Sequence, residues 1–233
     1  MIRIRSSSDR GRFDHGWLKT FHTFSFGRYQ DPAHRRFRGL VVINEDWIAP
    51  EAGFPLHPHD NMEIVTLVHS GSLEHRDDLG NGGVIRRGEL QRMTAGTGIA
   101  HAEFNPSKTE PVHLHQIWIL PERDGLPPSY EQRAIHLEAA RERFRTLASP
   151  DGRDGSLTLR ADAILSLVAL DEGKAVEQAI PKGRHAWIQV VRGEVVFNDA
   201  HPLSQGDGAA VSDESNISLR ASTGAEVLLF DLA

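Results

Sequence analysis

The chain has 233 residues, of which 39% are hydrophobic and 25% are charged, a composition typical of a globular protein with a sizeable core. Its net charge of −6 disfavours direct nucleic-acid binding, and no apolar run is long enough for a membrane span. The lack of cysteine excludes disulfides and thiolate metal ligands. The N-terminus has no apolar secretory segment, so we expect a cytoplasmic protein.

Short segments suited to β-strands follow one another over residues 1–120. Aromatic side chains alternate along residues 21–26, and β-branched or apolar runs follow at 38–43, 62–68 and 112–120. Glycine-containing turns separate these runs, notably Ser70-Gly71 and Gly88-Glu89. Short strands with regular turns and no helical period are typical of a β-sandwich or barrel.

Residues 121–156 break this rhythm. Apolar side chains recur there at helical spacing, which predicts a short helix around residues 138–148; they are Leu137, Ala140, Phe144 and Leu147. The following segment, residues 149–155, is rich in Pro, Asp and Gly and is the best candidate for a domain boundary.

Residues 157–233 return to short strands and repeat features of the first half. Thr66-Leu-Val-His-Ser-Gly71 is echoed by Ile188-Gln-Val-Val-Arg-Gly193, and Arg87-Gly88-Glu89 by Gln205-Gly206-Asp207. These echoes indicate a duplicated β-domain. When the glycines are aligned, nothing in the second copy matches the histidines described next, so the second copy is expected to lack a metal site.

Two pairs of metal-binding side chains stand at i and i+2, namely His57 with His59 and His101 with Glu103. On a β-strand this spacing places both side chains on one face, roughly 6.5 Å apart. Two adjacent strands could direct three imidazoles and one carboxylate at one metal and leave coordination positions open for catalysis. One pair alone could equally be a solvated strand face, but two pairs beside Gly-containing turns favour a metal centre.

The remaining histidines give weaker signals. His69 and His75 flank a turn and are expected at the surface, and His22 is expected to be partly buried with its hydrogen bonds satisfied. His113 and His115 alternate on a strand with hydrophobic neighbours, which favours a place in the barrel wall over contact with a substrate. Apolar neighbours of the ligand pairs are candidates for a pocket wall; they are Met62, Ile99 and Phe104.

These motifs resemble those of the cupin superfamily and, within it, the pirin family. The first cupin motif matches Gly53, His57-Pro-His59, Glu63 and Gly71, and the second matches Gly88, Thr94-Ala-Gly96, His101 and Asn105. The pirin resemblance rests on Phe-His-Thr-Phe-Ser-Phe at 21–26 and Met-Thr-Ala-Gly-Thr-Gly-Ile-Ala-His-Ala-Glu at 93–103. Trp-Ile-Gln-Val-Val-Arg-Gly at 187–193 and Val-Leu-Leu-Phe-Asp-Leu at 227–232 resemble the bacterial pirin-like bicupins.

The resemblance implies an all-β fold of two cupin domains, each a jelly roll or double-stranded β-helix, packed as a bicupin with a short helix in the connection. We expect an N-terminal metal-binding cupin domain over 1–135, a helix and linker over 136–156, and a C-terminal cupin-like domain without metal over 157–233.

The identity of the carboxylate ligand separates this chain from the general cupin pattern. Ordinary cupins take it from the first motif, here Glu63, whereas pirins take it two residues after the last histidine, here Glu103. Glu63 lies four residues beyond His59, about 13 Å along an extended strand, whereas Glu103 is one pleat from His101. We therefore expect the metal ligands to be His57, His59, His101 and Glu103.

For the bacterial members, the resemblance implies quercetin 2,3-dioxygenase activity, in which O2 is inserted across the heterocyclic ring of a flavonol and CO is lost. A divalent metal would act as Lewis acid and template for a flat aromatic substrate, and Glu103 could also act as the catalytic base. The sequence leaves the metal open among Fe(II), Ni(II), Mn(II), Co(II), Zn(II) and Cu(II). Among these we expect Fe(II), and the family also includes an iron-dependent transcriptional co-regulator.

That co-regulator suggests an alternative function, a metal-dependent protein that regulates through protein partners. A third alternative keeps the fold and changes the chemistry, since cupins also include isomerases and other oxygenases. The expected partners are thus a flavonol-like substrate and O2, with a protein partner as the alternative, and we expect a monomer.

Overall fold

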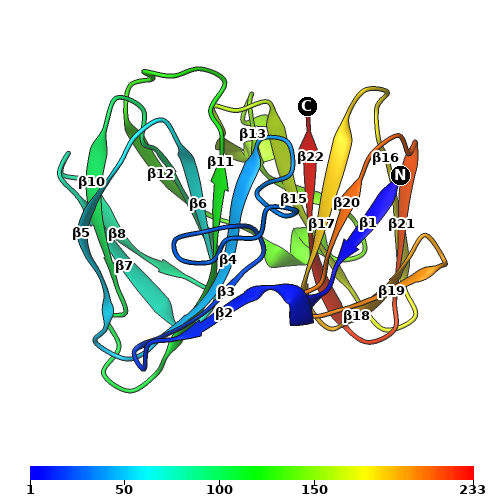
Figure 1. Ribbon diagram of the computed structural model, residues 1–233, viewed down its shortest axis with the longest axis horizontal. Coiled ribbons are helices and arrows are strands. Elements are labelled where there is room, and N and C mark those ends of the chain that lie inside the picture. Colours follow the sequence, from blue (N-terminus) through cyan, green and yellow to red (C-terminus); the bar gives the residue numbers. More distant parts are fainter. The chain divides into compact units, whose positions relative to one another are not determined.

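The computed structural model describes residues 1–233, and almost all of its regular structure is β-strand. The chain forms two compact units. The N-terminal unit comprises Gly11–Ile135 and Leu159–Ala161, and the C-terminal unit comprises Met1–Arg10, His136–Thr158 and Asp162–Ala233. Each unit contains one seven-stranded and one four-stranded sheet, which confirms the all-β fold (Figure 1). None of the helical segments is long enough or apolar enough to cross a lipid bilayer.

In the N-terminal unit the larger sheet has the order β12-β9-β6-β11-β4-β3-β2, and the smaller has the order β5-β10-β7-β8. All pairings are antiparallel. The strands are β2 (Gly11–Asp14), β3 (Leu18–His22), β4 (Leu40–Ile48), β5 (Gly53–His59), β6 (Glu63–Ser70), β7 (Ser72–Asp77), β8 (Gly82–Arg86), β9 (Glu89–Thr94), β10 (Ile99–Phe104), β11 (Val112–Ile119) and β12 (Ser129–Ala134).

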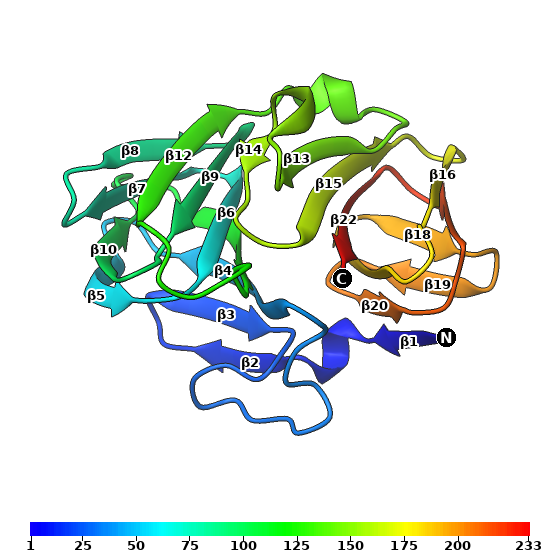
Figure 2. The same ribbon diagram turned by 90° about the horizontal axis from the view of Figure 1, so that it is seen from above.

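In the C-terminal unit the larger sheet has the order β1-β20-β17-β22-β15-β13-β14, and the smaller has the order β16-β21-β18-β19 (Figure 2). The strands are β1 (Ile2–Arg5), β13 (Arg145–Ser149), β14 (Leu157–Thr158), β15 (Ala163–Leu170), β16 (Ala175–Ala179), β17 (His185–Arg192), β18 (Glu194–Phe197), β19 (His201–Ser204), β20 (Gly208–Val211), β21 (Asn216–Ala221) and β22 (Ala225–Leu232). Three 3-10 turns complete it, namely η1 (Ser7–Asp9), η2 (Leu137–Ala140) and η3 (Arg153–Gly155).

The two units repeat one topology. β6, β11 and β4 are consecutive in one large sheet as β17, β22 and β15 are in the other, and β5-β10-β7-β8 corresponds to β16-β21-β18-β19. Gly71 and Gly193 occupy corresponding turns of the two units, with φ of 72° and 75°. A Cβ at Gly71 would lie 2.6 Å from the carbonyl oxygen of Pro111, and one at Gly193 would lie 2.2 Å from that of Gly224. The echo between the sequences therefore reflects a shared backbone requirement for glycine.

The interiors of the two units differ in polarity. One continuous cluster of apolar side chains fills the C-terminal unit, including the fully buried Phe197 and Leu219. In the N-terminal unit one apolar cluster lies around Leu73 and another around Met93. This unit also buries many polar side chains, among them Glu63, His75 and Gln91.

The connection between the halves differs from the sequence expectation. The helix expected over 138–148 is limited to the 3-10 turn η2, and Arg145–Ser149 forms strand β13 instead. Glu142 breaks the helical path with a left-handed φ of 54°, and β13 pairs with β15 in the large sheet. Pairing with a neighbouring strand thus overrides the local helical spacing, and residues 136–156 lie in the C-terminal unit rather than forming a separate linker.

The start of the N-terminal domain also differs from the sequence expectation. The first ten residues were expected in the N-terminal domain, but Met1–Arg10 belongs to the C-terminal unit. The reason is that β1 hydrogen-bonds along β20, with Ile2 opposite Val211 and Arg5 opposite Gly208. Pairing between segments so distant in the chain leaves no trace in local sequence pattern.

Candidate metal centre and pocket

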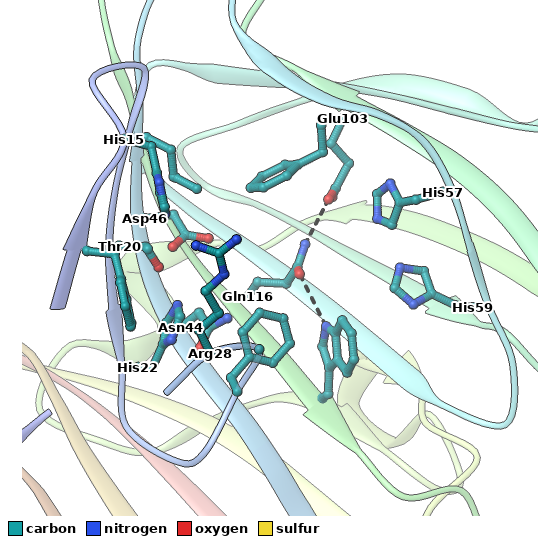
Figure 3. Close-up of a pocket in the computed structure, with 16 residues that line it drawn as sticks. His15, Thr20, His22, Arg28, Asn44, Asp46, His57, His59, Glu103 and Gln116 are labelled. Atoms are coloured by element: carbon teal, nitrogen blue, oxygen red, sulfur yellow. Dashed lines mark hydrogen bonds between the residues drawn. The ribbon is translucent and has the colours of Figure 1, made fainter. Parts of the chain in front are cut away.

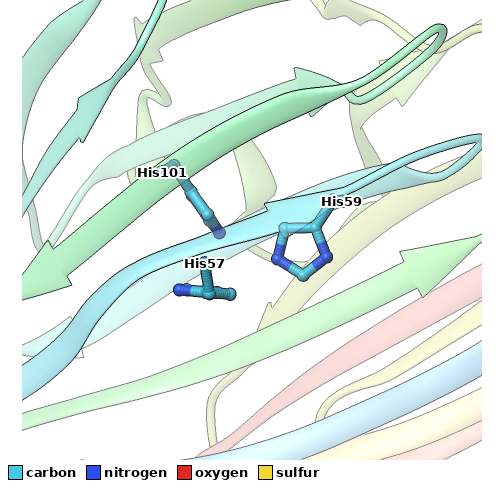
Figure 4. Close-up of side chains that lie close together, drawn as sticks. All are labelled: His57, His59 and His101. Atoms are coloured by element: carbon cyan, nitrogen blue, oxygen red, sulfur yellow. The ribbon is translucent and has the colours of Figure 1, made fainter.

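Three histidines converge on one point inside the N-terminal unit. β5 and β10 are antiparallel neighbours, and their register sets His101 opposite His57 and Ile99 opposite His59. The ring centroid of His101 lies 4.5 Å from that of His57 and 4.8 Å from that of His59. Their nitrogen ligand atoms all lie within 4.8 Å of one another, close enough to hold a metal ion (Figure 4).

The surroundings of these imidazoles favour their neutral form, which can bind a metal. The Nδ1–H group of His57 donates to the carbonyl oxygen of Pro55 at 2.8 Å, which leaves its Nε2 lone pair for a metal. Burial, and then the neighbouring His57, lowers the pKa of His59 to about 4. Burial and the surrounding histidines lower the pKa of His101 to about 2. Both rings are therefore unprotonated at neutral pH, as metal binding requires.

A fourth histidine supports His101 from behind. His75 is fully buried, contrary to the expected surface position, and its Nδ1 lies 3.3 Å from Nδ1 of His101. Its Nε2 lies 3.5 Å from Oδ2 of Asp77. When Nδ1–H of His101 donates to His75, the His75 proton lies on Nε2 and faces Asp77. Nε2 of His101 is then a free lone pair, and this buried atom has no hydrogen-bond partner in the protein.

Glu103 lies on the same strand but belongs to a different group of ligand atoms. Its carboxylate clusters with His101 and His75, not with all three ligand histidines. Gln116 Nε2 donates to Glu103 Oε2 at 2.8 Å, whereas Oε1 is buried without a hydrogen-bond partner. Burial raises the pKa of Glu103 to about 7, and the charge of Asp46 acts in the same direction.

Glu63 occupies a different environment. It is fully buried, and its Oε2 accepts a hydrogen bond from the backbone N–H of Arg160 at 3.1 Å. Burial raises the pKa of Glu63, although hydrogen bonds from Thr94 and Arg160 oppose the shift. Glu63 belongs to neither group of clustered ligand atoms.

A pocket of about 500 Å³ opens beside the histidines (Figure 3). His57, His59 and Glu103 line one part of it. Much of its wall is apolar, formed by Phe13, Leu18, Phe26, Phe54 and Trp118, and a polar group is formed by Thr20, His22, Asn44 and Asp46. His15, Gly27, Arg28 and Gln116 complete the lining.

The apolar wall differs from the one expected. Phe104 is 38% exposed and does not line the pocket. Ile99 is buried in the apolar cluster around Met93, and Met62 packs against that cluster. His22 is buried as expected, but its Nδ1 has no hydrogen-bond partner, so it is not a satisfied core histidine.

His69, His113 and His115 form a separate group that does not line the pocket. His69 was expected at the surface but is buried, and its Nε2 lies 2.6 Å from Nδ1 of His115. His113 Nε2 lies 3.0 Å from Oε1 of Glu45, and its ring stacks on Trp47. These contacts agree with the place in the barrel wall expected for His113 and His115.

The sequence patterns did not predict two features of the site, namely the buried position of His75 and the place of Asn44 and Asp46 in the pocket wall. His75 shares its strand face with the buried Leu73, so the period-2 alternation in Ser72–Asp77 could have placed it inside. Asn44 and Asp46 lie two residues apart on β4, but Ile43 and Glu45 are buried as well, so no alternation of burial marks the pocket-facing pair. The signal was therefore present for His75 and absent for Asn44 and Asp46.

The donor set fits a divalent transition metal. Neutral imidazoles and a carboxylate are the ligands such metals take when no thiolate is available. Two of the buried atoms, Nε2 of His101 and Oε1 of Glu103, have no hydrogen-bond partner. Buried polar atoms without partners are costly, and a bound cation would satisfy both.

Comparison with known proteins gives matches along the whole chain. Residues 3–119 match the Pirin family model, and residues 146–232 match the model of the quercetinase C-terminal cupin domain. The chain is 47% identical to a quercetin 2,3-dioxygenase of Escherichia coli K12, over 100% of this chain and 99% of that protein.

Comparison with solved structures gives matches to the same kind of protein. The crystal structure of the bacterial pirin YhhW from Escherichia coli in complex with nickel(II) is 47% identical, with a TM-score of 0.95, and the match covers 100% of this chain and 99% of that one. YhaK from Escherichia coli is 31% identical with a TM-score of 0.76, covering 95% and 97% of the two chains. The fold, the duplicated sheets and these full-length matches together mean that the chain belongs to the pirin family.

Proposed function

We propose that this protein is a metal-dependent dioxygenase of the pirin type, which opens the heterocyclic ring of flavonols such as quercetin with O2 and releases CO. The observation that carries the proposal is a largely apolar pocket of about 500 Å³ with His57, His59 and Glu103 in its lining. A pocket of this size and character suits a flat aromatic ligand. The relative named quercetin 2,3-dioxygenase, 47% identical over its length, supports the same activity.

The proposed ligands of a single divalent metal are His57, His59, His101 and Glu103. Support for the histidines comes from their convergence within 4.8 Å. Support for Glu103 over Glu63 comes from its clustering with His101 and from its place in the pocket lining, whereas Glu63 belongs to neither group of clustered ligand atoms and does not line the pocket. We propose Fe(II) as the native metal, with Ni(II), found in the similar Escherichia coli structure, as the alternative to test.

When bound, the metal would supply Lewis acidity toward the adjacent hydroxyl and carbonyl oxygens of a flavonol. The chain's own residues have three tasks. Phe13, Phe54 and Trp118 hold the flat rings and limit the access of water. Glu103, which lines the pocket beside the histidines, acts as the general base that accepts the proton of the flavonol hydroxyl. Gln116 holds one oxygen of Glu103 in place.

The proposal is tested by titrating quercetin anaerobically into metal-free, Fe(II)-loaded and Ni(II)-loaded protein. We expect the flavonol absorption band to shift only with metal present, and oxygen uptake with CO release to begin when air is admitted. An absence of oxygen uptake with either metal would rule out the dioxygenase. The relative rates with Fe(II) and Ni(II), together with metal analysis of freshly purified protein, decide between the two metals.

The ligand assignment has its own matched pair of variants. Glu103→Gln should lose most of its metal affinity, and Glu63→Gln should keep it. The reverse result would mean that Glu63 is the carboxylate ligand. Because both carboxyls are fully buried and both substitutions are isosteric, a general effect on folding would appear equally in the two variants.

A further inference from the structure

A compact polar group lies in the same pocket on strands other than those of the histidines. β3 and β4 are antiparallel neighbours, with Thr20 opposite Asp46 and His22 opposite Asn44. All four side chains are buried, at 3% to 7% exposure, and all line the pocket. Figure 3 shows them on the wall away from His57 and His59. We call these four residues the β3–β4 cluster.

Three atoms of this cluster are left without partners. Oδ1 of Asn44, Oδ1 of Asp46 and Nδ1 of His22 are buried and make no hydrogen bond within the protein. A buried polar atom without a partner destabilises the protein, so three such atoms facing one pocket point to a ligand that supplies the missing hydrogen bonds. Their position on rigid, paired strands makes them a preformed site.

The chemistry of the three atoms defines what would bind. The amide oxygen of Asn44 accepts hydrogen bonds only. Oδ1 of Asp46 accepts them when the carboxyl group is ionised, and because burial raises the pKa of Asp46 to about 7, the group can also donate when protonated. Burial, followed by the nearby His15, lowers the pKa of His22 to about 4, so its ring is neutral near pH 7. A neutral imidazole also has one accepting nitrogen. The cluster therefore calls for ligand groups that donate hydrogen bonds.

Two further features narrow the ligand class. Arg28 lines the pocket and can donate to a ligand oxygen, and the aromatic rings of Phe13 and Phe26 also form part of its wall. A phenolic hydroxyl suits this mixture, because it donates through its proton, accepts through its oxygen and lies in the plane of a flat apolar ring. An aliphatic polyol would leave the aromatic wall without a partner, and a carboxylate would face the oxygens of Asn44 and Asp46.

We propose that the β3–β4 cluster is a second subsite, which binds ring hydroxyls of the flavonol that lie away from the hydroxyl–ketone pair directed at the histidines. This inference rests on the proposed function and deepens it. The favoured substrates are then polyhydroxylated flavonols, and a flavonol without additional ring hydroxyls should bind more weakly.

The test is anaerobic binding of a flavonol series to the Ni(II)-loaded protein. 3-Hydroxyflavone carries only the hydroxyl beside the ketone, and its analogues add hydroxyls on the pendant ring, on the fused ring or on both. We expect at least one hydroxylated analogue to bind about ten-fold more tightly than 3-hydroxyflavone, the gain that one well-placed hydrogen bond gives. The analogue that shows the gain identifies which ring reaches the cluster.

Variants of the protein test the same hydrogen bonds by changing the cluster instead of the flavonol. Asn44→Leu should abolish most of the preference for the hydroxylated analogue while 3-hydroxyflavone still binds. The conservative Asp46→Asn, which keeps a carbonyl acceptor, should retain the preference. Gln91→Met is the matched control, because Gln91 is a buried amide with unpartnered atoms in the same unit but does not line the pocket. It should leave the preference unchanged.

The outcomes are distinct. Failure of the loaded wild-type protein to bind any flavonol would overturn the proposed function, and this inference with it. Binding of all flavonols with equal affinity would leave the proposed function intact and overturn the subsite. Retained preference in a folded, metal-loaded Asn44→Leu protein would also overturn it. If Asn44→Leu fails to fold, the wild-type comparison between flavonols decides alone.

Discussion

His57, His59 and His101 reach one point from two strands, yet each is held by different neighbours. The Pro55 carbonyl accepts the Nδ1–H of His57, the indole of Trp118 packs edge-on against His59, and His75 contacts His101. Metal-binding histidines are commonly oriented by a partner on the other ring nitrogen. The support of His101 is unusual in being a second histidine, itself beside Asp77.

Replacing His75 tests this support. We expect His75→Phe to weaken metal affinity by about 10- to 100-fold, the usual effect of removing a residue that orients a ligand. His75→Gln, whose side-chain carbonyl can still accept from His101, should recover much of the loss. Metal affinity is measured by competition with a chromophoric chelator, together with the ligand-field spectrum of the Co(II) protein.

His136→Ala is the control for that experiment, because His136 begins η2 without forming a side-chain cap. It should change neither the affinity nor the spectrum. An unchanged Co(II) spectrum and affinity in His75→Phe would mean that His75 serves packing only.

At the scale of elements, the pairing of β5 with β10 brings the proposed metal ligands together. The register shifts between His101 and Glu103, so that Glu103 lies opposite Phe54 and Phe104 opposite Gly53. The backbones approach closely there, since a Cβ on Gly53 would lie 2.1 Å from the carbonyl oxygen of Glu103. Gly53 therefore permits the strand contact that positions Glu103.

We expect Gly53→Ala to push β5 away from β10 and to weaken metal binding. The clash should also lower the free energy of unfolding by about 1–3 kcal/mol, the usual cost of overpacking. Chemical denaturation and metal titration measure the two effects. Gly39→Ala is the matched control, because its Cβ would meet nothing nearer than 3.9 Å. Equal metal affinity in the two variants would contradict this role for Gly53.

At the scale of the whole molecule, one topology is used twice with different interiors. β16 and β21 correspond to β5 and β10 but carry no histidine, and both groups of clustered ligand atoms lie in the N-terminal unit. The interior of the C-terminal unit is occupied by the apolar cluster around Phe197 and Leu219.

We therefore predict one tightly bound metal per chain. Equilibrium dialysis followed by elemental analysis should give a stoichiometry near one, falling to near zero in His101→Ala. A second equivalent that survives His101→Ala would reveal a site elsewhere in the chain.

The stability of the metal-free protein should depend on pH through Asp46. Burial raises the pKa of Asp46 from 3.8 to about 7, and the charge of Glu45 adds to the effect. The folded state then binds the proton more tightly than the unfolded state does. The stabilisation is complete below about pH 4 and is lost as the pH rises to about 7, on the order of 4 kcal/mol if Asp46 acted alone.

We expect Asp46→Asn to lose less stability than the wild type between those pH values. The free energy of unfolding in urea, with a chelator present, gives the comparison. Asp124→Asn, at an exposed site, should follow the wild-type curve. The prediction is contradicted if the free energy of unfolding changes by the same amount between pH 4 and pH 7 in the wild type, Asp46→Asn and Asp124→Asn.

The sequence alone determined features that depend on local spacing. The i, i+2 pairs at His57 and His101 predicted ligands on one strand face, and the glycines at 71 and 193 revealed the duplicated fold. The two patterns are informative because a strand alternates its side chains with period two and a left-handed turn favours glycine. The structure brings His57, His59 and His101 together, and the roles of these three residues and of Glu103 as metal ligands stay predictions.

Only the tertiary structure decided what depends on contacts between distant segments. It placed β1 in the C-terminal unit, turned Arg145–Ser149 into a strand, and brought His75 behind His101. It also assembled the β3–β4 cluster opposite the histidines. The physical reason is that strand pairing satisfies backbone hydrogen bonds across long chain separations, so register and sheet order, not local pattern, fix which side chains share an interior.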